Sequence, residues 1–147
     1  MRMKDKTPAL SFYTPAPGRG ITAPFITALV PAGFASPAQD FMECRISLDE
    51  TLCRNSETTF FIRVSGNSMV NAGIDDGDIL VVDRSLEPAD GKIAICLIDG
   101  DFTVKRLKTE TGCVYLMPEN PDYPALKVTE YNQFSVWGIV TYLIKKV

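Results

Sequence analysis

Histidine is absent from this chain of 147 residues. Its absence excludes a Ser-His-Asp triad, so a serine nucleophile would need another base to take its hydroxyl proton. The remaining known base for an isolated serine is a neutral lysine, because arginine does not deprotonate in proteins. Such a lysine must lower its pKa from about 10.4 to near 7, a difference of about 5 kcal/mol that burial among apolar neighbours supplies.

Metal-binding and disulfide patterns are also missing. The four cysteines, Cys44, Cys53, Cys96 and Cys113, show no CxxC spacing, which argues against a zinc site in a chain without histidine. Cys96 and Cys113 fall in apolar, strand-like runs and are predicted to be buried thiols. Disulfides stay open on sequence alone, but reduced thiols in the cytoplasm are the simpler interpretation. No metal and no cofactor is predicted.

Long basic runs and long apolar runs are missing as well. The net charge is -3 and no run of Lys or Arg is longer than two, so the chain lacks the electrostatic footprint of direct nucleic-acid binding. Contact with a protein that is itself on DNA stays open. No stretch approaches the roughly 20 apolar residues of a membrane span. With 46% hydrophobic residues, the chain is long enough for one domain with a single core.

The first 39 residues differ in kind from the rest. They hold six of the ten prolines and little regular periodicity, so we interpret them as an extended arm. Residues 21–39 are uncharged and fairly apolar, and Gly33 and Ala35 have the spacing of a signal-peptide cleavage site. A secretory signal is therefore the alternative, although Pro24 interrupts the apolar run that it would need.

Downstream of the arm, the pattern predicts a mostly β domain. Strands are predicted at residues 58–64, 79–82, 92–98, 101–108, 113–117 and 134–144. Asp99-Gly100 predicts a two-residue hairpin turn between two of them. A capping box at Ser47 predicts a helix to about Asn55, and residues 36–39 predict a second, shorter capped turn. The single tryptophan, Trp137, is expected to pack in the core.

Ser68 lies in the connection between two predicted strands, residues 65–78. Loops carry a large share of reactive groups. Gly66 and Met69 predict a tight turn that exposes the Ser68 hydroxyl above an apolar floor. An ordinary polar turn is the alternative on local composition.

Three carboxylates follow in the same connection, those of Asp75, Asp76 and Asp78. A cation site is conceivable there, but the residues lack the spacing of a calcium loop. A solvated turn is the simpler interpretation.

Lys105 is a candidate base on the predicted strand 101–108. Alternation along the strand places it on the same face as the apolar Leu107. Pattern alone does not choose it over Lys92 or Lys108, and a solvated lysine on an edge strand is the alternative.

Three motifs carry a family resemblance: SGNSM at residues 65–69, GIDDGD at 73–78 and DGDFTVKRL at 99–107. Together they resemble the LexA-type self-cleaving serine peptidases, and within that group the UmuD type that acts in SOS mutagenesis. The resemblance implies a peptidase domain of twisted antiparallel sheets at residues 33–147, preceded by a cleavable extended arm at residues 1–32.

The resemblance also implies roles for single residues. Ser68 would be the nucleophile, Lys105 the general base and Ala32-Gly33 the scissile bond, with backbone amides at Asn67 and Ser68 stabilising the oxyanion. UmuD relatives often carry cysteine where this chain has Ala32, but alanine is the usual residue at LexA-type cleavage sites.

By the same resemblance, the protein would be a cytoplasmic homodimer that cuts itself slowly until a RecA filament on single-stranded DNA stimulates it. The shortened form would then serve a UmuC-like translesion polymerase as an accessory subunit, with no membrane contact and no sequence-specific DNA binding of its own. The alternative is a non-catalytic binding module with a vestigial Ser-Lys pair. A signal-peptidase-like membrane protease also uses Ser and Lys, but it would need a membrane anchor.

Overall fold

The computed structural model describes residues 10–16, 18, 23–26 and 42–147. The predicted scissile pair Ala32-Gly33 and the predicted capped turn at 36–39 lie outside the described residues. Two compact units are present, one of Met1–Pro15 with Asn55–Val147, called the body here, and one of Ala16–Arg54. The division at residues 32 and 33 stays a prediction.

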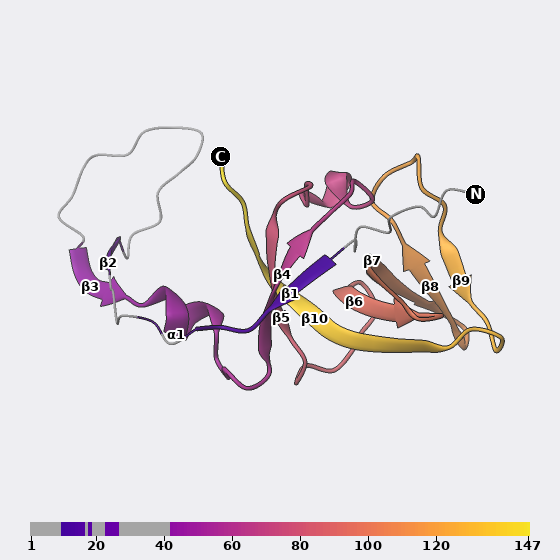
Figure 1. The fold of residues 1–147 in the computed structure, drawn as a ribbon, viewed down its shortest axis with the longest axis horizontal. Helices are drawn as coiled ribbons and strands as arrows, with labels where there is room; N and C mark the ends of the chain where they lie inside the picture. Colours follow the sequence, from indigo (N-terminus) through magenta and orange to yellow (C-terminus); the bar gives the residue numbers. More distant parts are fainter. Residues whose placement is uncertain (1–9, 17, 19–22, 27–41) are drawn as a thin grey trace, which may run out of the picture. The chain divides into compact units, whose positions relative to one another are not determined.

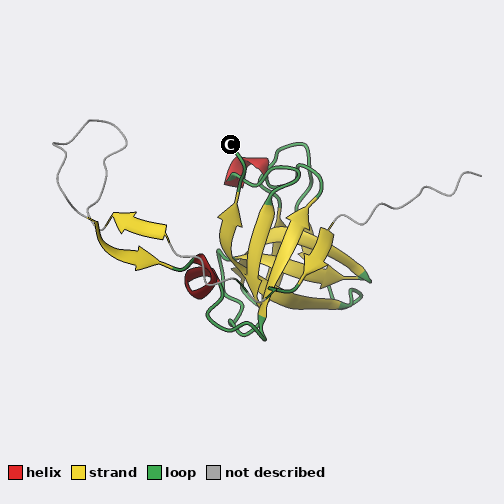
Figure 2. Cartoon of the chain, turned by 60° about the vertical axis from the view of Figure 1, so that its left-hand side comes forward, coloured by secondary structure: helices red, strands yellow, loops and turns green. Residues whose placement is uncertain are grey.

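An eight-stranded antiparallel sheet makes up the body and curls on itself (Figures 1 and 2). The predicted mostly β fold is thereby confirmed. In spatial order the strands are β1 (Leu10–Tyr13), β4 (Thr59–Val64), β5 (Ile79–Asp83), β10 (Phe134–Ile144), β6 (Ile93–Ile98), β7 (Asp101–Glu110), β8 (Cys113–Met117) and β9 (Leu126–Val128).

The longest strand, β10, joins the two halves of this sheet (Figure 1). Its first half pairs with β6 and its second half with β5, and the register shifts once in each half. Such bulges increase the local twist and bend a strand. The bent β10 therefore lets one continuous sheet wrap around two core clusters.

The hairpin predicted at Asp99-Gly100 is confirmed. Both turn residues have positive φ, 49° and 86°, as a two-residue type I′ turn requires. The turn sets the register of β6 and β7, which places Lys105 directly opposite Ala94.

Buried side chains form two clusters, on opposite sides of β6. One contains Ile62, Leu80, Ile95 and Val104, and the other contains Ala94, Cys96, Leu107 and Leu116. Because β6 and β7 contribute to both clusters, neither strand has a fully solvated face. This burial on both sides is what places a lysine of β7 in apolar surroundings.

Trp137 is only half-buried and lies at the margin of the first cluster. Its ring contacts Phe12, Phe60 and Phe102, and the Arg84 guanidinium lies 4.4 Å from the ring centroid. Phe12 belongs to β1, a strand that lies in the predicted arm and was not predicted. The arm is therefore not wholly without regular structure, because Leu10–Tyr13 completes the edge of the body sheet beside β4.

The unit Ala16–Arg54 contains two short strands that were also not predicted, β2 (Ala23–Ile26) and β3 (Met42–Ile46), paired antiparallel. Helix α1 (Leu48–Leu52) follows, and the Ser47 hydroxyl accepts a hydrogen bond from the Glu50 N–H, as the capping box predicts. The helix ends three residues before the predicted Asn55.

Three cysteines of the described residues, Cys53, Cys96 and Cys113, are free thiols. Cys96 is buried as predicted, but Cys113 is only half-buried, because it begins β8 after the turn at Gly112. Within the described part of the chain, no helix has the length and apolar character to cross a membrane.

Gly138 allows β10 to approach β5 closely. A Cβ atom at this position would lie 2.6 Å from Cγ1 of Val82, a buried and stiff side chain. We predict that Gly138→Ala lowers the free energy of unfolding by about 1–3 kcal/mol through overpacking. Urea unfolding measures the change, and Ser135→Ala, on the exposed side of β10, is the control with an effect within about 0.5 kcal/mol. Superimposable curves for Gly138→Ala and wild type would contradict the prediction.

Candidate active site

The loop that carries Ser68 connects β4 to β5 and contains one 3-10 turn, η1 (Val70–Ala72). Met69 is 2% exposed and belongs to the first core cluster, whereas Ser68 beside it stays half-buried. Gly66 has a φ of 101°, in the left-handed region that favours glycine. The loop therefore has the expected tight turn and apolar floor.

Ser68 opens into a cleft of about 200 Å³. The loop residues 65–69 form one wall and Thr103 to Lys105 of β7 form another, with Leu10 and Tyr123 at its margins. Backbone groups of Asn67 and Ser68, the predicted oxyanion donors, belong to residues of the same wall.

Lys105 reaches Ser68 inside this cleft. Its Nζ lies 3.1 Å from Ser68 Oγ, 2.7 Å from Thr103 Oγ1 and 3.0 Å from the carbonyl oxygen of Val104. An ammonium group would donate to all three oxygens. A neutral amine keeps two N–H donors for Thr103 and Val104, and its lone pair is left for the proton of the Ser68 hydroxyl.

Burial lowers the pKa of the Lys105 amine below its ordinary value, because desolvation disfavours the charged form. A negative charge on Cys96 would oppose this effect. However, burial raises the pKa of the Cys96 thiol to about 12, so the thiol is uncharged near neutral pH. Desolvation therefore dominates, in the direction that a lysine base requires.

Lys92 and Lys108, the two alternatives from the sequence, do not reach the cleft. Both are exposed, and the Lys108 Nζ lies 2.8 Å from Glu110 Oε1, whose hydrogen bond raises the pKa of that lysine. The structure thus brings only Lys105 of these three to Ser68.

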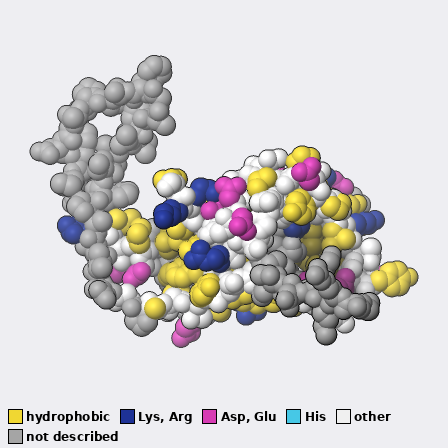
Figure 3. Space-filling model, turned by 45° about the horizontal axis from the view of Figure 1, so that its top comes forward, with side chains coloured by type: hydrophobic (Ala, Val, Ile, Leu, Met, Phe, Trp, Pro, Cys, Tyr) yellow, Lys and Arg dark blue, Asp and Glu magenta, His cyan; other side chains and the backbone are white. Residues whose placement is uncertain are grey.

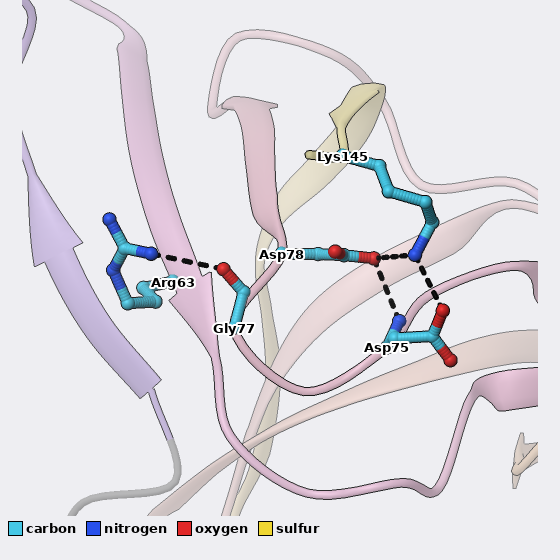
Figure 4. Close-up of polar contacts among 5 residues, drawn as sticks. All are labelled: Arg63, Asp75, Gly77, Asp78 and Lys145. Atoms are coloured by element: carbon cyan, nitrogen blue, oxygen red, sulfur yellow. Dashed lines mark hydrogen bonds and ion pairs between the residues drawn. The ribbon is translucent and has the colours of Figure 1, made fainter. Parts of the chain in front are cut away.

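The acidic turn after Ser68 is held by a lysine from the end of the chain (Figure 4). Lys145 Nζ donates to Asp75 Oδ2 and to Asp78 Oδ2, at 2.6 and 2.5 Å. Asp78 is only 7% exposed, so the expectation of a solvated turn is wrong for this residue. Burial alone would raise its pKa, but hydrogen bonds from Lys145 and from the Asp75 N–H outweigh it and lower the pKa.

No group of three or more metal-ligating side chains lies together among the residues that the structure describes. The remaining carboxylate of the turn, on Asp76, accepts a hydrogen bond from the Gly66 N–H at 2.8 Å. All three carboxylates that suggested a cation site therefore have partners within the chain. Asp76 holds the loop before Ser68, at the Gly66 N–H, and Asp78 holds it after Ser68, at the Asp75 N–H.

Sequence reasoning missed two contributors to this site. Thr103, two residues before Lys105 on the same strand face, accepts the shortest hydrogen bond of the amine. Glu119 donates its backbone N–H to the Ser68 carbonyl oxygen at 2.8 Å, and its carboxylate pairs with Arg106 Nε at 2.6 Å. Strand periodicity contained a signal for Thr103, but none for Glu119, which follows β8 and meets the loop only in the folded chain.

Comparison with known proteins identifies the family. The family model described as "Peptidase S24-like" matches residues 24–141, which is most of the chain. The chain belongs to the Peptidase S24-like family. It is therefore a serine peptidase of the LexA and UmuD type.

Named relatives agree with this assignment. Protein SamA of Salmonella typhimurium is 42% identical over 85% of this chain and 86% of its own length. Protein MucA of Escherichia coli is 40% identical over 89% of this chain and 90% of its own length. LexA repressor of Paracidovorax citrulli is 33% identical over 91% of this chain but only 59% of its own length. The resemblance to the UmuD type within the LexA-type group is confirmed.

The lowered pKa of Lys105 makes stability depend on pH. Between the folded and unfolded pKa values of this amine, the unfolded chain binds more protons, so stability rises with pH across that window. We predict that Lys105→Met, which has no charge to desolvate, has a higher free energy of unfolding than wild type at neutral pH. This difference should shrink towards pH 10, because the stability of wild type rises with pH across this window. Urea unfolding at several pH values tests this.

Lys92→Met, at an exposed position just before β6, is the matched control for this measurement. The prediction would be contradicted if the difference in free energy of unfolding between Lys105→Met and wild type stayed constant from neutral pH to pH 10.

Proposed function

We propose that this protein is a self-cleaving serine endopeptidase in which Ser68 attacks the Ala32-Gly33 bond and Lys105 is the general base. The observation that supports the pair is the 3.1 Å between Lys105 Nζ and Ser68 Oγ in a cleft where burial lowers the pKa of the amine. This distance is within the range over which a base takes a proton directly.

The proposed reaction has two steps. In the first, the neutral Lys105 amine takes the Ser68 proton while Oγ bonds to the Ala32 carbonyl carbon, and backbone N–H groups of Asn67 and Ser68 stabilise the oxyanion. Lys105 then returns the proton to the Gly33 nitrogen as the peptide bond breaks. In the second step, a water molecule gives a proton to Lys105 as its oxygen bonds to the carbonyl carbon of the Ala32 ester, and Lys105 passes this proton to Ser68 Oγ as the ester bond breaks.

The arm is suited to this reaction by its small residues and by its attachment. Ala32 and Gly33 leave the carbonyl open to attack, and an extended segment with such side chains fits a narrow cleft. Because the arm is tethered to a catalytic domain, its own or that of a second copy, effective concentration replaces binding affinity. In our proposal a RecA filament on single-stranded DNA acts as a co-protease by ordering the arm and contributes no catalytic residue.

The processed form would act in the SOS response as an accessory subunit of a UmuC-like translesion polymerase in the cytoplasm. We propose a homodimer, which the half-exposed apolar side chains Tyr142, Leu143 and Ile144 at the end of β10 support. On the face in Figure 3, basic side chains are interspersed with acidic ones. Such mixing supports contact with proteins rather than direct binding to DNA.

Self-cleavage tests the proposal directly. We predict that Ser68→Ala and Lys105→Ala each slow cleavage by about 10³-fold or more. In wild type, the rate should rise with pH as the Lys105 amine deprotonates, until it reaches a plateau. Mass spectrometry after incubation with RecA, nucleotide and single-stranded DNA should find a new amino terminus at Gly33.

Lys92→Ala is the control variant and should cleave at the wild-type rate. Unchanged processing of Lys105→Ala would overturn the assigned base. Wild-type protein that stays intact at high pH and with activated RecA, while still binding the polymerase, would instead favour the non-catalytic binding module.

A further inference from the structure

The segment that follows β8 is attached to the Ser68 loop by three hydrogen bonds. Glu119 N–H donates to the Ser68 carbonyl at 2.8 Å, Asn71 N–H donates to the Glu119 carbonyl at 2.8 Å, and Asn120 Nδ2 donates to the Asn67 carbonyl at 2.9 Å. The first two bonds involve only backbone atoms. Asn120 therefore supplies the side-chain bond of this attachment that substitution can remove.

The orientation of the Asn120 amide follows from its second contact. Its Oδ1 accepts a hydrogen bond from the Asp122 N–H at 2.9 Å. A backbone N–H requires the oxygen end of the amide, so the NH₂ end must face the Asn67 carbonyl. Both ends of the side chain are thus paired, and the donor to Asn67 is held in place.

Holding the Asn67 carbonyl also sets the direction of the next N–H. A trans peptide unit is planar, and its carbonyl and N–H point to opposite sides. The described residues contain no cis peptide bond. The Asn67 carbonyl accepts a hydrogen bond from Asn120 Nδ2 at 2.9 Å and a longer one from the Val70 N–H at 3.4 Å. Asn120 makes the shorter of the two bonds, and when it draws the carbonyl to one side, the N–H of Ser68 must point to the other.

The two sides of this peptide differ in their surroundings. Asn120 lines a neighbouring hollow, together with Met117 and Pro121, and is not among the residues that line the Ser68 cleft. The Asn67 carbonyl is therefore drawn towards the neighbouring hollow, which leaves the Ser68 N–H to the cleft where an oxyanion would form.

We propose that Asn120 is a positioning residue that orients the Ser68 N–H for oxyanion stabilisation by fixing the Asn67-Ser68 peptide plane. The inference rests on the proposed self-cleavage and adds to it a residue outside the cleft. Removing an oxyanion donor costs about 10²–10³-fold in rate. Because Asn120 acts through the peptide and is not itself the donor, its loss should cost less, about 10- to 100-fold.

The test uses full-length protein and two variants. Asn120→Ala removes both contacts of the side chain, whereas Asn120→Asp keeps an oxygen for the Asp122 N–H and replaces the donor to Asn67 with a carboxylate oxygen, which repels the carbonyl. Both should cleave about 10- to 100-fold more slowly on the pH plateau. In Asn120→Ala, the pH midpoint of cleavage should stay at its wild-type value, because this variant adds no charge and leaves the contacts of Lys105 unchanged. Asn132→Ala is the matched control, since that amide donates to Asp99 at the hairpin turn.

A second readout isolates the oxyanion. A peptide that ends Leu-Val-Pro and carries the boronic acid analogue of alanine adds to Ser68 Oγ, and the tetrahedral boron places an oxygen in the oxyanion position. The corresponding peptide amide binds without forming a tetrahedral centre. In Asn120→Asp, the boronate concentration that halves self-cleavage should rise by about 10-fold or more, and that of the amide should not change. If the role of Asn120 were purely structural, Asn120→Asp would weaken the binding of the boronate and of the amide equally.

The outcomes are distinguishable. The inference is supported if the wild-type protein cleaves itself and is inhibited by the boronate, while the Asn120 variants cleave more slowly and Asn120→Asp binds the boronate, but not the amide, more weakly. If the wild-type protein cleaves itself and both Asn120 variants cleave at the same rate, the inference is overturned and the proposed function stays intact. A wild-type protein that neither cleaves nor binds the boronate overturns both. Thermal unfolding of each variant identifies a folding defect, and equal loss of boronate and amide binding in Asn120→Asp also counts against the inference.

Discussion

The site depends on the partial desolvation of a primary amine that contacts a hydroxyl. Lys105 achieves this because β7 lies between β6 and β8 and has apolar neighbours on both faces. The residue opposite it, Ala94, is small enough to leave room for the lysine stem. Desolvation disfavours the ammonium form, so the same burial that makes the amine a base also makes the charged form costly to the folded state.

Two separate braces hold the serine against this amine. On one side, the acidic turn is anchored by Lys145 and by the bond between Asp76 and Gly66. On the other side, the segment at Glu119 and Asn120 is bonded to the loop itself. Since that segment continues from β8, which pairs with β7, the brace links the Ser68 loop to the strand that carries Lys105. A loop held at both ends loses little freedom when a reaction begins, which is how preorganised sites lower a barrier.

Local patterns predicted much of this fold. Asp99-Gly100 identifies its hairpin because few residues other than Asn, Asp and Gly accept positive φ in a two-residue turn, and the predicted bounds of β10 match those observed. The short strands β1 and β9 were missed because three or four residues contain too little alternation to recognise. Their strand conformation comes from pairing with β4 and β8, which is a tertiary effect.

Composition by itself determined that a serine in this chain has lysine as its possible basic partner, because no histidine is present. Alternation along 101–108 also placed Lys105 beside Leu107, but it left Lys92 and Lys108 as equal candidates. Only the tertiary structure decided among them, because the environment of each amine depends on residues distant in the chain. Ser68 is 37 positions away from Lys105. The contribution of Asn120 likewise required the fold, since a hydrogen bond across 53 positions leaves no periodic trace in the sequence.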